Sequence, residues 1–251
     1  MGILFDSRNY ATKSTPRQLG NKQELLKVRS FIAGAIEGIY TINKLSAEKI
    51  VITGDGSKKQ DKNLQKLVIK GDFTGFIENA DANDTTVQSL TYSGKDGRLK
   101  IKNIGEAETS ELGSVGEWLS FEDDKLSKSI FAGDDVIYGT KKKQANQVIM
   151  GFDGDDELIL YGGERANGGR GSDTFKVTKK AITRKSNTAV EEQQVVIEDA
   201  TQKDGDSVIL PRIKGGYVDI NQVSYESKLN SNLNGTILLE EFGSTVNPVF
   251  G

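Results

Sequence analysis

The chain has 251 residues, of which 36 are acidic and 33 basic, so a formal net charge of −3 gives no sign of a nucleic-acid partner. It contains neither cysteine nor histidine, which excludes disulfides, thiol catalysis, the Ser-His-Asp triad and the H-E-x-x-H zinc motif. Because the sequence holds no apolar run long enough to cross a bilayer, no transmembrane segment is expected.

The first twenty residues are polar apart from Ile3, Leu4 and Phe5, and this pattern predicts an extended N-terminal arm over residues 1–20. The apolar cluster is far too short to be the core of a secretory signal peptide. We expect the arm either to be a disordered tail or to add a strand to the sheet edge of a neighbouring copy. Repeated head to tail, the second arrangement would give a homo-oligomer or polymer.

Residues 21–127 predict one helix followed by a β region. Apolar residues recur at spacings of three and four over residues 21–40, which predicts a helix with one apolar face: Leu25, Val28, Ile32, Ala35, Ile36 and Ile39. From Glu48 the period changes to two, and Gly/Asp turns separate strands expected at 49–53, 66–70, 85–92 and 98–103. The acidic residues 105–127 are expected to form a short helix or a linker.

Residues 133–176 contain three copies of a pattern rich in glycine and aspartate. Residues 168–176, GGRGSDTFK, match the nonapeptide G-G-x-G-x-D-x-U-x at every fixed position. Residues 151–159, GFDGDDELI, match it with Phe152 at the second glycine, and Gly133, Asp135 and Ile137 supply a third G-x-D-x-U core. Each unit is expected to form a turn and a short strand, and the turns must stack because one alone cannot bury its apolar U residue.

The pattern predicts a calcium site, because glycine turns bring carbonyl oxygens close to an ion and aspartate adds the hard oxygen that Ca²⁺ prefers. Asp135 and Asp153 lie eighteen residues apart, as do Asp155 and Asp173, which is the spacing of nine-residue units on one edge of a stack. The register is imperfect, because Asp135 and Asp156 are 21 residues apart and Asp156 and Asp173 are 17 apart, and an insertion of three lysines at 141–143 explains the first gap. A surface loop is the alternative interpretation, and it would suit a single copy better than three. The expected ligands are Gly133, Asp135, Asp153, Asp155, Asp156, Gly169, Gly171 and Asp173.

This stretch resembles the RTX (repeats-in-toxin, haemolysin-type) calcium-binding β-roll family. SIFAGDDVIYGT before the repeats and VVIEDATQKDGDSVILP after them also resemble that family, so the resemblance covers residues 128–212. It implies an all-β fold, a parallel β-roll or β-solenoid whose turns bind Ca²⁺. It says little about activity, because the same roll occurs in toxins, proteases, lipases, adhesins and surface-layer proteins.

RTX proteins are typically exported by a type I secretion machinery that reads an uncleaved C-terminal signal, which the resemblance extends to this chain. Residues 213–251 are expected to hold C-terminal strands and that signal, since no basic residue follows Lys228. An ordinary final strand is the alternative. Further strands are expected at 194–198, 207–210, 216–220 and 236–239.

Without histidine and cysteine, and with no recognisable pairing of catalytic carboxylates, the chain is expected not to be an enzyme. The sequence favours a secreted, calcium-binding structural or adhesive protein of the cell surface, extracellular matrix or biofilm, self-assembling into a layer or filament. The alternative is a carbohydrate-binding module, or a non-catalytic part of a polysaccharide-modifying enzyme, with surface polysaccharide as the partner.

Overall fold

The computed structural model describes residues 3–10, 21–54, 64–79, 85–94, 97–104, 116, 123–141, 147–181, 195–200, 204–211, 222–226, 234–239 and 249–250. The helices are α1 (Asn21–Ile36), α2 (Thr74–Asn79) and α4 (Asp123–Ile130). The strands are β1 (Leu4–Tyr10), β2 (Thr41–Ser46), β3 (Lys49–Thr53), β4 (Leu64–Asp72), β5 (Thr86–Gly94), β6 (Gly97–Lys102), β7 (Val136–Tyr138), β8 (Gln147–Asp153), β9 (Glu157–Leu160), β10 (Glu164–Arg170), β11 (Thr174–Val177), β12 (Val195–Ile197), β13 (Ser207–Leu210), β14 (Gln222–Glu226), β15 (Asn234–Leu239) and β16 (Val249–Phe250).

The described chain is mostly β, as the alternating apolar pattern predicts. The strands expected at 49–53 and 207–210 coincide with β3 and β13, and the predicted helix coincides with α1 except for its last turn. The strand expected at 216–220, residues 11–20 of the predicted arm and most of the stretch 105–127 lie outside the described residues.

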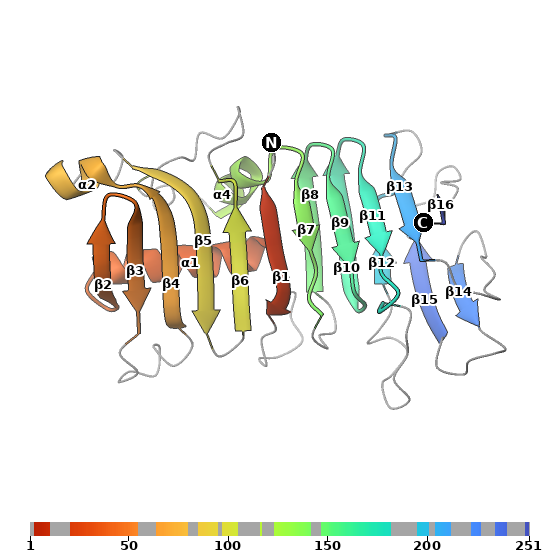
Figure 1. Ribbon diagram of the computed structural model, residues 1–251. Coiled ribbons are helices and arrows are strands. Elements are labelled where there is room, and N and C mark those ends of the chain that lie inside the picture. The colour runs from red at the N-terminus through yellow and green to blue at the C-terminus, as the bar shows by residue number, and fades with distance from the viewer. Residues whose placement is uncertain are drawn as a thin grey trace.

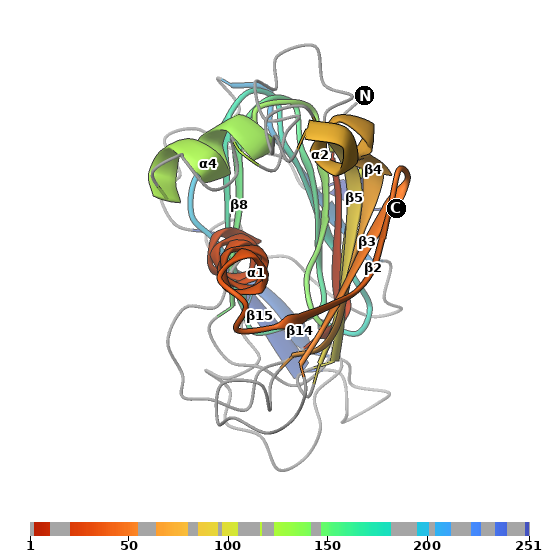
Figure 2. The same cartoon turned by 90° about the vertical axis from the view of Figure 1, so that its left-hand side faces the viewer.

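Two facing sheets form the body of the molecule (Figures 1 and 2). The larger has eleven strands in the order β16-β13-β11-β9-β7-β1-β6-β5-β4-β3-β2, and the smaller has five in the order β14-β15-β12-β10-β8. In the larger sheet, β2 to β6 form an antiparallel half that ends against β1, whereas β1, β7, β9, β11, β13 and β16 run parallel.

The parallel half is built by a chain that crosses repeatedly between the two sheets: β7, β9, β11 and β13 belong to the larger sheet, and β8, β10 and β12 to the smaller (Figure 1). The apolar U residues of the three repeats stack in register, Ile137 beside Leu158 and Leu158 beside Phe175, and Val208 of β13 continues the row beside Phe175. All four are fully buried between the sheets. The predicted stacking of the U residues is therefore confirmed.

The N-terminal segment differs from the predicted arm, because residues 4–10 form β1 within the molecule's own sheet. This strand pairs antiparallel with β6 and parallel with β7, and so joins the two halves (Figure 1). Ile3 and Phe5 are buried, and the Phe5 ring lies 5.9 Å from the Phe131 ring. The expectation of a disordered tail or of a strand added to a neighbouring copy is wrong for these residues, because their partners are residues 97–102 and 136–138 of the same chain.

Helix α1 continues the layer of the smaller sheet and covers the inner face of the antiparallel half (Figure 2). Leu25, Val28 and Ile32 are buried against that face. At the start of the helix, the Asn21 side-chain amide donates to the Met150 carbonyl at 2.6 Å and accepts from the Met150 N–H at 3.1 Å. Asn21 thereby satisfies two backbone groups at the free edge of β8.

None of the described helices is both long enough and apolar enough to cross a membrane.

Candidate functional site

Four aspartates stand one above another where the parallel strands of the larger sheet begin. They are Asp135, Asp156, Asp173 and Asp206, which we call the aspartate column. Each immediately precedes its strand, and the strands β7, β9, β11 and β13 are adjacent in the sheet. Consecutive members of the column are therefore separated by one strand spacing, about 4.8 Å.

A chain of hydrogen bonds links each aspartate of the column to the next one and links the first, Asp135, to Ile3 beside the N-terminal strand. The N–H of Ile3 donates to Asp135 Oδ1 at 2.5 Å, and the N–H of Asp135 donates to Asp156 Oδ1 at 2.7 Å. The N–H of Asp156 donates to Asp173 Oδ1 at 2.9 Å, and the N–H of Asp173 donates to Asp206 Oδ1 at 2.8 Å. One oxygen of each carboxylate is therefore used to hold the preceding turn.

The second carboxylate oxygen, Oδ2, is the unusual feature of two of these aspartates. Oδ2 of Asp135 and Oδ2 of Asp156 are buried and have no hydrogen-bond partner. Burial is the main cause that raises the pKa of Asp135 to about 7, of Asp156 to about 9 and of Asp173 to about 6. Neighbouring carboxylates raise these pKa values further, which is the electrostatic situation that a bound cation relieves.

Glycines opposite the column leave room for these oxygens. A Cβ atom on Gly151 would overlap both Asp156 Oδ2 and the carbonyl oxygen of Gly168, so a carboxylate oxygen and a backbone oxygen face the same point. A Cβ on Gly168 would in turn overlap Asp173 Oδ2. Gly171 also carries a positive φ of 129°, and its turn lies against the Gly154 carbonyl of the previous repeat.

A second, exposed column runs beside the first. The N–H of Asp155 donates to Asp134 Oδ1 at 2.9 Å, and the N–H of Ser172 donates to Asp155 Oδ1 at 2.7 Å. The Ser172 hydroxyl then donates to the Gly205 carbonyl at 2.8 Å. Asp155 is thus placed among the turns, as predicted, but in this outer column and not in register with Asp173.

The expected eighteen-residue pairs, Asp135 with Asp153 and Asp155 with Asp173, are wrong, whereas the spacings of 21 and 17 residues that interrupt this register are the ones the structure uses. Successive members of the aspartate column, which lies inside the exposed second column, are separated by 21, 17 and 33 residues in sequence, because each connection through the smaller sheet has its own length. We also call it the inner column. Asp153 therefore does not stand beside Asp135. It is exposed at the end of β8, with its Oδ1 atom 3.9 Å from Nε of Arg170.

The other predicted residues lie in the turns. Asp135, Asp156 and Asp173 belong to the aspartate column, Gly133 lies against Gly154 of the next repeat, and Gly169 adopts a φ of 100° close to the Phe152 carbonyl. Phe152 itself has a φ of 81° where the repeat pattern has glycine. Its ring stacks on Phe131 at 5.7 Å, a contact that offsets part of the cost of this backbone conformation.

Sequence reasoning missed Asp206 and Asp199 as members of the site. Asp206 could have been found, because Asp206, Ser207 and Val208 repeat the D-x-U core of the other turns. Asp199 follows β12, and its two carboxylate oxygens accept hydrogen bonds from the N–H groups of Gly168 and Gly169, each at 2.8 Å. No repeated spacing in the sequence indicates this contact.

The opposite ends of the strands hold a different pair of buried polar residues. Gln147 and Glu164 are neighbours in register on β8 and β10. Gln147 Oε1 accepts from the N–H of Thr140 at 3.0 Å, and Glu164 Oε1 accepts from the N–H of Tyr161 at 3.0 Å. Both side chains therefore hold the turn that leads into their strand. Burial raises the pKa of Glu164 to about 7.

The residues of the inner column fit a hard cation such as Ca²⁺. The orphaned buried carboxylate oxygens and the carbonyl oxygen beside Gly151 are the donor type that this ion prefers. Within the part of the chain that the structure describes, no cluster of three or more acidic side chains is arranged as a metal site. Backbone carbonyls would therefore have to supply much of the coordination.

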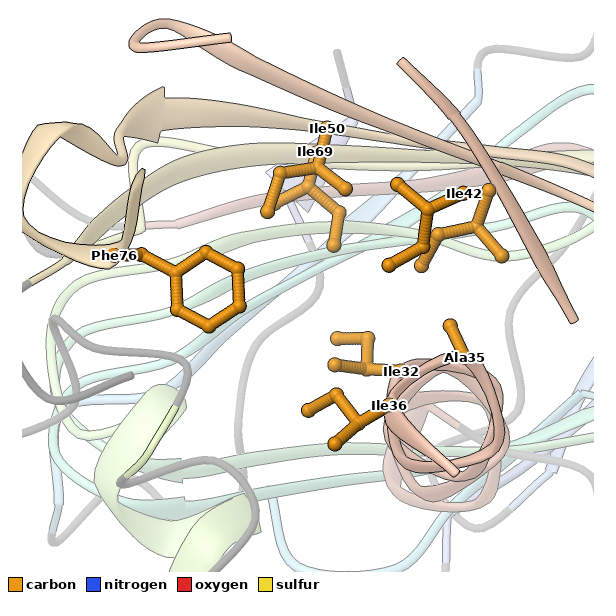
Figure 3. A pocket seen from close by; sticks show the side chains of 8 residues that line it. Ile32, Ala35, Ile36, Ile42, Ile50, Ile69 and Phe76 are labelled. Atoms are coloured by element: carbon orange, nitrogen blue, oxygen red, sulfur yellow. The ribbon is translucent and has the colours of Figure 1, made fainter. Parts of the chain in front are cut away.

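An apolar groove lies at the far end of the molecule, between the C-terminal part of α1, strands β2 to β4 and α2 (Figure 3). Its lining contains no polar side chain that could orient a substrate. The lining residues are Ile32, Ala35, Ile36, Ile42, Ile50, Ile52, Ile69 and Phe76.

Comparison of the chain with family models, with curated proteins and with solved structures finds no match.

Proposed function

We propose that the parallel half is a calcium-binding β-roll of the RTX type, and that the protein is a secreted structural or adhesive protein. The observation that carries the calcium proposal is the aspartate column, with its buried and unpartnered Oδ2 atoms on Asp135 and Asp156. Repeated crossing of the chain between two sheets, with U residues in register, supports the roll.

Bound Ca²⁺ would supply the positive charge that compensates the stacked carboxylates. Asp135 and Asp156 would hold it through their unpartnered Oδ2 atoms, together with carbonyl oxygens of the glycine turns. The same carboxylates already hold neighbouring turns through their Oδ1 atoms, so binding and the stacking of the turns are coupled. A ligand that binds only the folded state stabilises it, by about 2.7 kcal/mol at a hundredfold excess over Kd.

Thermal melting followed by circular dichroism tests this proposal on the full chain. We expect a higher Tm in millimolar CaCl₂ than in EGTA, and no comparable rise in MgCl₂, which demands a more regular octahedral site. Identical melting curves in CaCl₂ and EGTA would remove calcium from the proposal.

The proposed place of action is outside the cell, at the cell surface or in an extracellular matrix or biofilm. Support comes from the RTX resemblance, from the calcium-rich medium there and from a sequence that lacks the usual catalytic histidine and cysteine. Under this proposal the protein has no catalytic activity, reaches the medium through type I secretion machinery and assembles into a layer or filament. Electron microscopy of the purified protein with and without Ca²⁺ tests the assembly.

Export is best tested by transfer of the C-terminal residues to a reporter, because a deletion would also remove β15 and β16 from their sheets. Residues 229–251 fused to the C-terminus of an unrelated cytoplasmic protein should carry that protein into the medium of cells with a type I exporter. Retention of the fusion inside the cell would leave the segment as ordinary final strands.

A further inference from the structure

The antiparallel half of the larger sheet carries basic side chains almost without acidic ones. Strands β2 to β6 contain seven lysines and arginines, whereas their single acidic residue, Asp72, stands at the end of β4 and accepts hydrogen bonds from Thr74. This contrasts with the whole chain, whose net charge is −3. The seven basic residues are Lys44, Lys49, Lys66, Lys70, Arg98, Lys100 and Lys102.

All seven point away from the core. Successive side chains of a strand alternate between the two faces, and the buried residues beside six of these bases face α1. Lys44, whose neighbours on β2 are exposed, pairs with Val51, which lies on the same face as Lys49. Cross-strand register places the bases on the opposite face, which is turned to the viewer in Figure 1 and which we call the basic face. Lys66 pairs with Ser93, which pairs in turn with Arg98, and the same order repeats as Lys70, Ser89 and Lys102. In the line between them, Thr91 pairs with Val68 on one side and with Lys100 on the other.

Positive charge is in excess on the basic face, and the nearest described acidic neighbour in register is Asp6 of β1, which lies opposite Lys100 and is paired with Arg8. Lys49 lies directly opposite Lys70, an arrangement that destabilises a sheet. None of the seven forms a salt bridge with a described residue, whereas Arg8 is paired with Asp6, Arg165 with Glu198 and Lys176 with Glu157. A set of like charges that costs stability and forms no salt bridge with the described residues indicates an external anion.

The side chains that lie between the basic residues indicate which kind of anionic polymer the basic face suits. Ser89, Thr91 and Ser93 alternate with the bases across β5, and the one aromatic residue of β2 to β6, Tyr92, is buried. The face therefore lacks the exposed rings on which single-stranded nucleic acids stack, and a sheet face has no element that enters a duplex groove. Charge and hydroxyl groups suit a linear polymer that carries anions and hydroxyls on successive units.

The bases also lie in lines across the strands. One line follows the register Lys49, Lys70, Ser89 and Lys102, with neighbouring positions about 4.8 Å apart. A flexible chain with one anionic group on each sugar can follow such a line, and each contact replaces a counterion. A fluid membrane surface would require no such lines.

We propose that the basic face binds a linear acidic polysaccharide, one that carries carboxylates on successive sugars. The inference rests on the proposed function, since it names the polymer that an adhesive protein outside the cell would hold. The binding site itself belongs to the antiparallel half and does not use the aspartate column.

The test measures binding of the full-length protein to short oligouronates, too short to gel with calcium, by titration calorimetry in millimolar CaCl₂. The double variant Lys49→Gln/Lys70→Gln should bind about tenfold more weakly, because two anion contacts are lost. The matched control Lys128→Gln/Lys176→Gln removes the same charge from α4 and β11 and should bind like the parent protein. Lys49→Arg/Lys70→Arg should retain binding, which shows that charge at these positions matters.

Three results would overturn the proposal: no binding of the oligouronate, equal loss in both glutamine variants, or tighter binding to single-stranded DNA or to vesicles of phosphatidylserine. Neutral dextran should not bind at all. Melting of the same samples in CaCl₂ and EGTA reports separately on calcium. If the parent protein melts at the same temperature in CaCl₂ and in EGTA but still binds the oligouronate, the proposed calcium role is refuted and the polysaccharide inference stands.

Discussion

Asp156 and Asp153 illustrate how one carboxylate differs from another three residues away. Asp156 is buried in the column with an unpartnered oxygen, whereas Asp153 is exposed. Asp156→Asn keeps an acceptor for the N–H of Asp135 but removes the carboxyl whose pKa burial raises to about 9, and with it the cost of protonating that group on folding at neutral pH. In EGTA we expect this variant to be more stable than the parent, on the order of 2 kcal/mol. Its Tm should respond little to calcium.

Asp153→Asn is the control for this prediction. It changes the same charge at an exposed position and should keep the parent's Tm in EGTA and its response to calcium. Melting of the three proteins in both buffers gives the answer. A full calcium response in Asp156→Asn would show that the column does not bind the ion.

A substitution at Gly151 tests whether the aspartate column needs the space that this glycine leaves open. A methyl group there would overlap Asp156 Oδ2 and the Gly168 carbonyl, so Gly151→Ala should cost about 2–4 kcal/mol and weaken calcium binding. Gly38→Ala is the comparison: Gly38 has a φ of 76° and open space around it, so its cost should be only about 1 kcal/mol. Urea denaturation measures both, and equal costs would contradict the steric argument.

The buried carboxyl of Glu164 predicts that the unfolding free energy depends on pH, independently of the aspartate column. Its pKa is raised from 4.5 to about 7 by burial, so the folded state favours the protonated form. The contribution of Glu164 to stability is fully present below pH 4.5 and is lost as the pH rises through 7, a change of about 3 kcal/mol. Glu164→Gln imitates its neighbour Gln147 and should remove this dependence.

The measurement is the difference in unfolding free energy between the parent and Glu164→Gln, from denaturant titrations in EGTA between pH 4 and pH 8. This difference should change in favour of the variant as the pH rises. A difference that stays constant over this range would mean that Glu164 ionises in the folded protein as readily as in the unfolded one.

At the scale of elements, Asn21 ties the start of α1 to the edge of β8. Asn21→Ala would leave the N–H and the carbonyl of Met150 without these partners, at a cost of about 1–3 kcal/mol. Ser30→Ala, on the exposed side of the same helix, should change stability by less than about 0.5 kcal/mol. Thermal denaturation of the two variants compares them, and a cost for Asn21→Ala no greater than that of Ser30→Ala would contradict the role at the edge.

Elements with a strong local pattern could be predicted from the sequence, and elements defined by distant partners could not. A short run of β-branched residues that follows a turn marks β3 as a strand, and Ile50, Val51 and Ile52 are all buried. Residues 4–10 offer no comparable signal, because Leu4, Asp6 and Arg8 point outward and their neighbours Lys102 and Tyr138 are remote in sequence. Only the assembled sheet shows that they form a strand.

The same distinction applies to the candidate site. The D-x-U cores identified Asp135, Asp156 and Asp173, because each local turn repeats the same chemistry. The fixed spacing failed, because the connections through the smaller sheet differ in length and no local pattern records that. The basic face was also missed, since it appears only when lysines from separate strands come side by side.

For the whole molecule, β1 predicts a single cooperative unit. Because this strand belongs to both halves, Phe5→Ala should destabilise the antiparallel and the parallel half together, by about 3–5 kcal/mol. Hydrogen exchange of β5 and of β11 should increase to the same extent. Faster exchange in only one of these strands would mean that the halves unfold independently.

The position of β1 also dictates when the protein can finish folding. The N–H of Ile3 donates a hydrogen bond to Asp135, 132 residues further along the chain, so β1 cannot complete its pairing until the ribosome has synthesised β7. Closing so long a loop slows the search for the native pairing, and sheets dominated by such distant contacts fold in milliseconds to seconds. Insertion of β1 between β6 and β7 is therefore expected to be a late step in refolding, and until it occurs both strands expose an unpaired edge to other chains.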